Sequence, residues 1–268
     1  MSEAPRTRPG PRAIAWADGR VLPASEATVP LTDDGFLRGD AVFDAMLVRR
    51  GRTHALDDHL ARLRASAKTM GIRVPVLRQV IVDLLAAWGE HDGALKLVVT
   101  RGGVVRGLVS PVSWPDSIAL ETVEMPWASA LAGVKTLSYA ANQWALRQAR
   151  DAHADDALIV DGGVLMELPT GALCLVLDGR VVTPDPGRLP ILDSVTVRQL
   201  GAVTDIERGT PTVADLDTAD EVFVVSATRP VLPVHAVGDR EYPAPGPVTE
   251  DLRSRFDDHI DATLDPLP

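Results

Sequence analysis

Amine chemistry in this chain depends on very few side chains. Among its 268 residues lysine occurs only at positions 68, 96 and 135, whereas arginine is used throughout. A lysine acts as a nucleophile or proton carrier after it loses a proton, which burial and neighbouring cations favour. Lys135 follows an irregular stretch, 125–130, and is the preferred candidate. Lys96 lies in a predicted strand and is the fallback, while Lys68 falls on the polar part of a predicted helix.

Two further charged residues could bind an anion and a cation. Arg62 is the planar, bidentate cation that suits a dianionic phosphate, although alone it is better explained as a surface residue of a helix. Glu167 follows a predicted hairpin and lies between Met166 and Leu168. Because burial of an unpaired carboxylate is costly, a buried Glu167 needs a cationic partner. The alternative is a strand residue that faces solvent.

Other patterns do not support the chemistry that they suggest. The glycine-rich segment 102–107 follows a strand, but the apolar segment 108–111 replaces the helix start that a dinucleotide-binding loop requires. The Asp-Asp-His trios at 57–59 and 257–259 fall on predicted helices, where adjacent residues point in different directions. Solvated helix faces therefore explain both trios better than a metal site. The sequence has no HExxH, CxxC or GxSxG motif, and no metal is expected.

The elements that must position these residues form two α/β halves. Strands are predicted at 13–22 and 41–55, each a hairpin pair, and at 94–100, 117–124, 221–227 and 231–237, with short hairpin strands after residue 152. Helices are predicted from a cap at Asp57 to Gly71, at 75–88, 137–152 and 194–205, and from near Thr249. Since the strands come in hairpins rather than strand–helix–strand units, the pattern argues against a doubly wound nucleotide fold.

Composition and charge limit the class of protein. The formal net charge of −10 gives no electrostatic reason to bind nucleic acid or an anionic membrane, and no apolar run is long enough to span a bilayer. Residues 1–12 are expected to be a disordered lead-in without the apolar stretch of a signal peptide. The single cysteine, Cys174, lies in an apolar run and is expected in the core. A chain without a disulfide fits a reducing compartment, so a cytoplasmic protein is expected.

Four segments of the chain together resemble one protein family. They are Gly39-Asp40-x-x-Phe43, His59-x-x-Arg62-Leu63, Lys135-Thr-Leu-Ser-Tyr139 and Gly163-Val-Leu-Met-Glu167. They are similar to segments of the class IV aminotransferases, which are pyridoxal 5'-phosphate (PLP) enzymes of fold type IV. That family includes D-amino acid and branched-chain aminotransferases and aminodeoxychorismate lyase. The resemblance runs from about residue 13 to the C-terminus.

The resemblance implies a fold and an assembly. It implies an α/β (α+β) fold with a small N-terminal α/β domain at 1–124 and an interdomain connection at 125–131. A larger PLP-binding domain with mostly antiparallel strands would follow at 132–268. It also implies a homodimer that places the site at the domain junction and takes a small, amino-acid-like substrate.

The resemblance also implies a role for each matching residue. Lys135 would carry PLP as a Schiff base and move the Cα proton of the substrate. Arg62 would bind the cofactor phosphate, and Glu167 would pair with the pyridine nitrogen, which keeps the ring an electron sink. The remaining cofactor contacts would come from the backbone at the helix start, Val195 and Thr196, and from the loop residues Ser226 and Ala227. Substrate contacts would come from Phe43, Arg106 and Thr228.

Some of these assignments have plain alternatives. An ordinary capped helix would explain the segment 191–196, and a strand-end turn would explain 226–228. Six positions also depart from the residue that the family, or one of its branches, often has: Ala45, Leu47, Leu108, Ala172, Val197 and Pro230.

Three details favour the lyase branch of the family. The segment 98–107 resembles the Arg-Gly segment of the lyases, in which Arg106 could clamp a carboxylate, and the segments 230–239 and 239–249 are similar to those of lyases. The sequence therefore favours aminodeoxychorismate lyase, which converts 4-amino-4-deoxychorismate to 4-aminobenzoate and pyruvate. Against this, Ala45 stands where lyases often have a threonine that assists proton transfer. An amino acid transaminase, of D-amino acid or branched-chain type, and a catalytically inactive family member remain alternatives.

Overall fold

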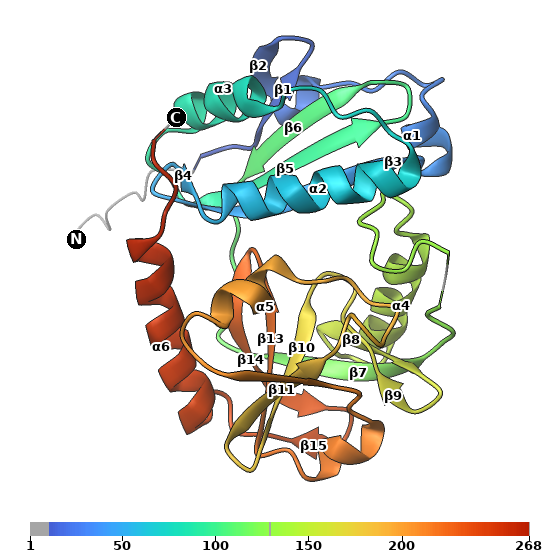
Figure 1. Ribbon diagram of the computed structural model, residues 1–268, viewed down its shortest axis with the longest axis vertical. Coiled ribbons are helices and arrows are strands. Elements are labelled where there is room, and N and C mark those ends of the chain that lie inside the picture. Colours follow the sequence, from blue (N-terminus) through green and yellow to red (C-terminus); the bar gives the residue numbers. More distant parts are fainter. Residues whose placement is uncertain (1–10, 129, 268) are drawn as a thin grey trace, which may run out of the picture.

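The computed structural model describes residues 11–128 and 130–267 of the chain (Figure 1). The elements up to residue 110 are β1 (Ile14–Ala17), β2 (Arg20–Pro23), α1 (Asp34–Arg38), β3 (Ala41–Arg49), β4 (Arg52–Thr53), α2 (Leu56–Met70), α3 (Arg78–Trp88), β5 (Gly93–Thr100) and β6 (Val105–Ser110). The later ones are β7 (Ile118–Glu124), α4 (Ala140–Asp151), β8 (Asp156–Asp161), β9 (Val164–Leu165), β10 (Ala172–Leu177), β11 (Arg180–Pro184), α5 (Val195–Leu200), β12 (Ile206–Gly209), β13 (Glu221–Ser226), β14 (Arg229–Val237), β15 (Arg240–Glu241) and α6 (Pro247–Ala262). Residues 1–10 of the predicted lead-in 1–12 lie outside the described residues.

The strands of the described residues form two sheets, which Figure 1 shows one above the other. The first has the order β2-β1-β6-β5-β3-β4 and the second β12-β11-β10-β13-β14-β7-β8-β9, with β15 beside β14. Parallel pairs occur between β11 and β12, β14 and β7, and β7 and β8. The other pairs are antiparallel, so the predicted mixed fold with mostly antiparallel strands is confirmed.

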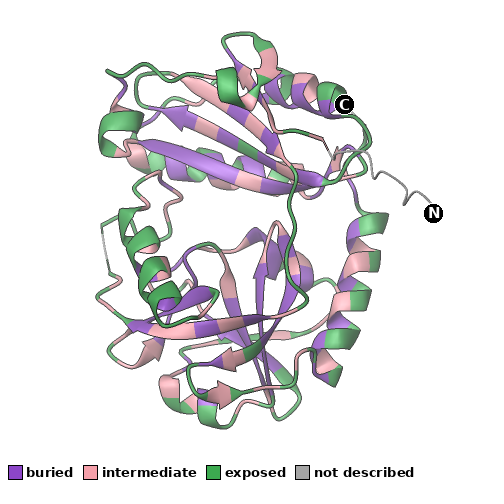
Figure 2. Ribbon diagram, turned by 180° about the vertical axis from the view of Figure 1, so that it is seen from behind, coloured by how far each residue is buried: buried purple, intermediate pink, exposed green. Residues whose placement is uncertain are grey.

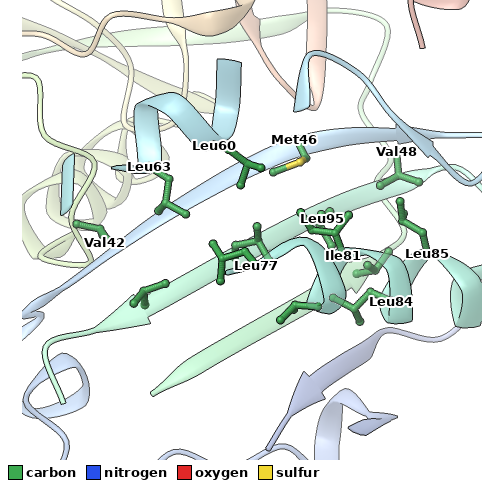
Figure 3. Packing of buried hydrophobic residues seen from close by; sticks show 14 of the residues in the cluster. Val42, Met46, Val48, Leu60, Leu63, Leu77, Ile81, Leu84, Leu85 and Leu95 are labelled. Carbon is green, nitrogen blue, oxygen red and sulfur yellow. The ribbon is translucent and has the colours of Figure 1, made fainter. Parts of the chain in front are cut away.

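Alternation along β3 gives the first sheet two different faces. Val42, Met46 and Val48 pack with Leu63 of α2 and Leu84 of α3 in one fully buried cluster (Figure 3). The alternate residues of β3 point the other way, toward the second half of the chain, where Leu47 joins the cluster around Phe256 of α6. One face of the sheet is therefore occupied by its own helices, and the other is available to a site.

The strands β8, β10 and β13 of the second sheet are largely buried, while its helices expose one side (Figure 2). Phe223 and Cys174 are fully buried in neighbouring strands, beneath Phe256 and Ile260 of α6. Burial raises the pKa of the Cys174 thiol to about 12, which fits the predicted core cysteine. Among the described residues no helix has the length and apolar character that crossing a membrane requires.

One predicted boundary needs correction. The strand β7 was assigned to the first domain, but it pairs in parallel with β14 and with β8 of the second sheet. The chain therefore changes sheets in the segment 111–117, which contains two prolines, rather than at 125–131. The segment 125–131 begins inside the second half, where Met125 donates a backbone hydrogen bond to Val160.

The start of one helix and the end of another also differ from expectation. The predicted cap Asp57 lies in the first turn of α2, while Ala55 takes the N-cap position in the left-handed region, with φ 55°. The amide of Leu56 instead donates to Asp265 Oδ2 at 3.0 Å, a partner far away in sequence. The predicted helix 194–205 is shorter than expected, because α5 ends at Leu200.

Candidate active site

Lys135 lies in the segment between β7 and α4, and its backbone is attached to the first half of the chain. Its carbonyl accepts a hydrogen bond from Phe43 N at 3.1 Å, and its amide donates to Ser66 Oγ of α2 at 3.1 Å. Thr136 forms an isolated antiparallel bridge with Val42 of β3. The first sheet and α2 thus position a lysine whose flanking segments belong to the second half.

Two aromatic rings flank the Lys135 side chain. Its Nζ lies 4.5 Å from the centroid of the Phe43 ring and donates to the Tyr139 hydroxyl at 3.4 Å. Burial and, next, the nearby Arg62 cation lower the pKa of the Lys135 amine to about 8, although Asp44 and Glu167 oppose the shift. About a tenth of the amine is therefore neutral at pH 7, far more than for an ordinary lysine.

Arg62 extends from α2 and is held by a buried carboxylate. Its Nε and Nη2 donate to the two oxygens of Asp44 at 2.9 and 2.8 Å, and His59 Nδ1 lies 2.8 Å from Asp44 Oδ1. Burial would raise the pKa of the fully buried Asp44, but the hydrogen bonds from Arg62 and His59 outweigh it and lower the pKa to about 2. Asp44 is thus an anion that fixes the guanidinium in one orientation.

The free edge of Arg62 faces the start of α5. Its Nη1 lies 3.4 Å from the carbonyl oxygen of Asp193, two residues before Val195. The first amides of a helix have no partner within the helix, so Val195 and Thr196 are available to an anion. Both line a small cavity with His59 and Ala227. The structure brings three predicted phosphate contacts, Val195, Thr196 and Ala227, to one cavity, and Arg62 faces the residues just before the same helix.

Glu167 is held at the other side of the cluster. Its two carboxylate oxygens accept hydrogen bonds from Trp127 Nε1 at 3.1 Å and from the amide of Leu192 at 3.3 Å. Burial raises the pKa of this carboxyl group, and the two hydrogen bonds only partly compensate. None of the described residues forms a salt bridge with Glu167 by side-chain contact. A carboxylate in this state would be stabilised by a cationic ligand atom.

Ser226 is the last residue of β13, and Ala227 and Thr228 form a two-residue hairpin turn between β13 and β14. The Ser226 hydroxyl accepts a hydrogen bond from Arg229 Nε at 3.3 Å, and Arg229 also pairs with the buried Asp156 at 3.0 Å. Thr228 is half-buried at the turn. Its predicted contact with substrate, like that of Ser226 with phosphate, stays a prediction.

Arg106 is not brought to Lys135 by a direct contact. Its guanidinium pairs with Asp18 at 3.1 Å and donates to the Thr28 carbonyl oxygen at 2.8 Å, across the strands β6 and β1. It does share a face of the first sheet with Phe43, because both pair directly with Val98 of β5. Arg106 would have to break its contacts with Asp18 and Thr28 before it could bind a substrate carboxylate as predicted.

Sequence reasoning missed three residues of the cluster. Asp44 falls in the predicted hairpin 41–55, Trp127 in the irregular stretch 125–130 and Tyr139 at the end of the lysine segment, but the sequence predicted no role for them. A signal existed for Asp44, because an aspartate among the otherwise apolar residues 41–48 of β3 needs a buried cation. Tyr139 lies four residues after Lys135, but the segment between them is not helical, so spacing alone gave no contact.

The donor set fits the cofactor that the resemblance implies. An amine of lowered pKa, an oriented guanidinium beside a helix start and a carboxylate without a cation match the aldehyde, phosphate and pyridine nitrogen of PLP in chemistry. Of the other lysines, Lys68 is exposed on α2, and Lys96 is exposed on β5 with its Nζ 5.2 Å from the Phe43 ring centroid.

Comparisons with known proteins give the family. D-alanine aminotransferase of Bacillus licheniformis is 28% identical over 91% of this chain and 95% of its own length. The bifunctional aminodeoxychorismate lyase / D-amino acid transaminase of Mycobacterium tuberculosis is 30% identical over 86% of this chain and 93% of its own. The PLP-bound form of a hypothetical aminotransferase from Mycobacterium tuberculosis superposes with a TM-score of 0.83 at 29% identity, covering 94% of this chain and 99% of that one.

A more distant solved structure agrees in fold. A branched-chain aminotransferase from the thermophilic archaeon Thermoproteus uzoniensis reaches a TM-score of 0.84 at 21% identity, covering 95% of this chain and 99% of that one. The profile of the family described as Amino-transferase class IV matches residues 41–237, which include Arg62, Lys135 and Glu167. The chain belongs to the class IV aminotransferase family.

Proposed function

We propose that the protein is a PLP-dependent amino acid transaminase with Lys135 as its catalytic residue. The observation that carries the proposal is the Lys135 amine, which lies between two aromatic rings with its pKa lowered to about 8. Relatives named as transaminases match the chain over nearly its whole length. The sequence favoured the lyase, and the relatives move the preference to the transaminase.

Lys135 and Tyr139 would have different roles in the reaction. When bound, PLP supplies an electron sink that stabilises negative charge at the substrate Cα. The neutral Lys135 amine would take the proton from the substrate Cα and would release it on the cofactor side rather than back to Cα, and its lowered pKa would let it do both near neutral pH. Tyr139, 3.4 Å away, accepts a hydrogen bond from the amine and orients it.

Two binding groups would hold the cofactor at opposite ends. Arg62 and the amides of Val195 and Thr196 would bind the phosphate, and Asp44 keeps the Arg62 guanidinium turned toward them. Glu167 would accept a hydrogen bond from the protonated ring nitrogen, which removes the cost of its burial. The distance between these ends would fix the reactive carbon of the cofactor against Lys135.

Aminodeoxychorismate lyase is the second candidate. It is favoured by the lyase-like segment 230–239 and by the Mycobacterium tuberculosis relative whose name carries both activities. Ala45 argues against the lyase, because this position, two residues after Phe43 on the same face of β3, has no hydroxyl to assist proton transfer.

One pair of assays separates the two candidates. Purified protein loaded with PLP is incubated with 4-amino-4-deoxychorismate, and separately with amino acids and a keto acid. The proposal expects amine transfer between amino acid and keto acid, and little pyruvate from 4-amino-4-deoxychorismate. Pyruvate release without amine transfer would establish the lyase instead, and neither activity would favour the inactive family member.

We also propose that the protein is a cytoplasmic homodimer. The dimer is implied by the family, and exposed apolar side chains of Leu31, Phe36 and Leu37 around α1 give a surface that a second copy could cover. Sedimentation velocity of the PLP-loaded protein should give twice the mass of the chain, and a monomer at micromolar concentration would contradict the proposal.

A further inference from the structure

Arg229 is a buried arginine beside the loop that is predicted to contact the cofactor phosphate. It is 3% exposed, and it lies at the start of β14, directly opposite Ser226 at the end of β13. Its Nη1 pairs with Asp156 of β8 at 3.0 Å, and its Nη2 donates to Thr170 Oγ1 at 2.5 Å. Its Nε donates to Ser226 Oγ at 3.3 Å. Each of the three guanidinium nitrogens therefore has a partner in the protein.

The surroundings of Arg229 hold its guanidinium in one place. A Cβ on Gly171 would lie 3.1 Å from Arg229 Nη2, so the backbone there comes closer than most side chains would allow. The Trp114 ring also lies against the guanidinium, with its centroid 4.6 Å from Cζ. Movement of Arg229 toward a ligand would leave the buried Asp156 without its cation, which is costly. Arg229 is thus a fixed donor to Ser226 rather than a ligand-binding residue.

This fixed donor determines which bond the Ser226 hydroxyl can still form. A serine hydroxyl has one proton to donate and two lone pairs that accept. One lone pair accepts from Arg229 Nε, and no hydrogen bond within the described part of the chain uses the hydroxyl proton. A hydrogen bond received from a cation polarises the hydroxyl, which makes its proton a stronger donor to an anion.

Ser226 is also next to the predicted phosphate contacts. The residue that follows it, Ala227, lines a cavity together with Val195 and Thr196 at the start of α5. The same guanidinium reaches the other end of the site, because Thr170 is three residues after Glu167. Arg229 therefore joins the two segments that would contact the phosphate and the ring nitrogen of the cofactor.

We propose that Arg229 is a positioning residue that makes Ser226 a hydrogen-bond donor to the cofactor phosphate. The inference rests on the proposed function, and it gives the buried pair of Arg229 and Asp156 a role in cofactor binding. Asp156 fixes the guanidinium, the guanidinium occupies one lone pair of Ser226 Oγ, and the hydroxyl proton is left for a phosphate oxygen. Arg229 itself does not touch the cofactor.

The test separates the Nε donor of Arg229 from its charge. R229K keeps a cation opposite Asp156, but lysine has a methylene where arginine has Nε, so Ser226 loses its donor. R229M/D156N removes the donor and both charges of the buried pair together. S226A removes the hydroxyl, and R180Q, at an exposed arginine of β11 that pairs with Glu207, is the control.

The readout is binding of the cofactor with and without its phosphate. PLP and pyridoxal, which lacks the phosphate, are titrated separately into each full-length, cofactor-free variant and followed by absorbance. In R229K, R229M/D156N and S226A the ratio of the two affinities should fall about tenfold, because a hydrogen bond to a charged group is lost. A general loosening of the structure would weaken both ligands alike and leave the ratio unchanged. R180Q should keep the ratio of the wild type.

A double variant tests whether the two side chains act together. R229K/S226A should lose no more of the preference for PLP than S226A alone, because both changes remove the same bond. Additive losses, or an unchanged ratio in R229K or R229M/D156N, would overturn the role of Arg229. A wild type that binds pyridoxal as tightly as PLP would overturn the phosphate site and this role with it. Absence of amine transfer with every donor, while the ratios behave as expected, would overturn only the proposed function.

Discussion

A single buried carboxylate, Asp44, holds the side chains of Arg62 and His59 in place. It accepts hydrogen bonds from both Arg62 and His59, and it turns the remaining edge of Arg62 toward the start of α5. Because Asp44 is on the helix-facing side of β3 while Phe43 is on the other, one strand supplies both the carboxylate that holds Arg62 and the ring beside Lys135. Phe43 and Asp44 can serve two different parts of the site because adjacent side chains of a strand point in opposite directions.

The first prediction concerns acid stability. The pKa of Asp44 is about 2 in the folded protein, against a usual 3.8, so its contribution is complete above about pH 4 and is lost as the pH falls toward 2. The contribution is roughly 2 kcal/mol. Urea unfolding between pH 6 and pH 2 should show a shallower loss of stability in D44N than in the wild type. Parallel curves would contradict the assigned pKa.

The second prediction concerns attachment of PLP to the cofactor-free protein. Only the neutral amine attacks an aldehyde, and the pKa of Lys135 is about 8. The attachment rate, followed by absorbance, should therefore rise about tenfold per pH unit below pH 8 and level off above it. The variant K135A should show no such phase. A rate that continues to rise to pH 10 would mean that the amine has an ordinary lysine pKa.

At the scale of elements, α3 packs closely on strand β6 of the first sheet. Gly107 of β6 has no side chain, and a Cβ there would lie 2.5 Å from Leu84 Cδ1 and 3.0 Å from Val80 Cγ1 of α3. Leu84 is fully buried, so it has little room to move. The missing side chain at Gly107 therefore permits the close approach of α3 to β6.

The third prediction tests this packing with a double-mutant cycle. G107A should lower the free energy of unfolding by about 1–3 kcal/mol because it overpacks the core. In the background of L84A, which itself costs about 2–5 kcal/mol, the same substitution should be close to neutral. The control G209A, on β12 where the nearest side-chain atom would be 3.9 Å away, should have little effect. Additive losses for G107A and L84A would contradict direct contact.

The sequence predicted most elements, because periodicity and turn residues are local signals. Gly71, with φ 65°, ends α2 as expected, and the hairpin at Asp18-Gly19 forms. It could not predict which half takes β7, since Pro111 and Pro115 break the chain before this strand as clearly as Pro126 does after it. Nor could it predict the partner of Leu56, because Asp265 lies more than two hundred residues later. Long-range contacts of this kind have no local signature.

For the site, motifs located the main residues but not their partners. Arg62, Lys135 and Glu167 were found because their segments resemble those of the family. Trp127, which donates to Glu167, was assigned only to a connection, since its contact depends on how 125–127 hydrogen-bond to β8. Arg106 was assigned from the sequence to the substrate, but it pairs with Asp18 across β1, a strand whose place beside β6 no motif specifies.

At the scale of the whole molecule, the site lies where the chain passes between its two sheets. The segment after β7 returns to the first sheet at Lys135, and the C-terminus returns to it where Asp265 N donates to the Thr53 carbonyl at 2.8 Å. Arg49 of β3 also pairs with Asp257 and Asp261 of α6. A cofactor that contacts Arg62 from one half and Glu167 from the other would tie the halves together.

The fourth prediction follows from that arrangement. PLP binds only the folded protein, so a saturating concentration should raise the unfolding temperature by several degrees. Scanning calorimetry should show the whole chain unfolding in one shifted transition. In R62A the shift should be much smaller, because the phosphate loses its main cation. A shift in R62A equal to that of the wild type would place the phosphate elsewhere.

The most direct test of the account is chemical. The PLP-loaded protein is reduced with borohydride and digested, and the peptides are examined by mass spectrometry, with K135A treated in parallel. The account predicts one pyridoxyl-modified peptide, containing Lys135, and none from K135A. Modification at Lys96 or Lys68, or unmodified Lys135 in the wild type, would contradict it.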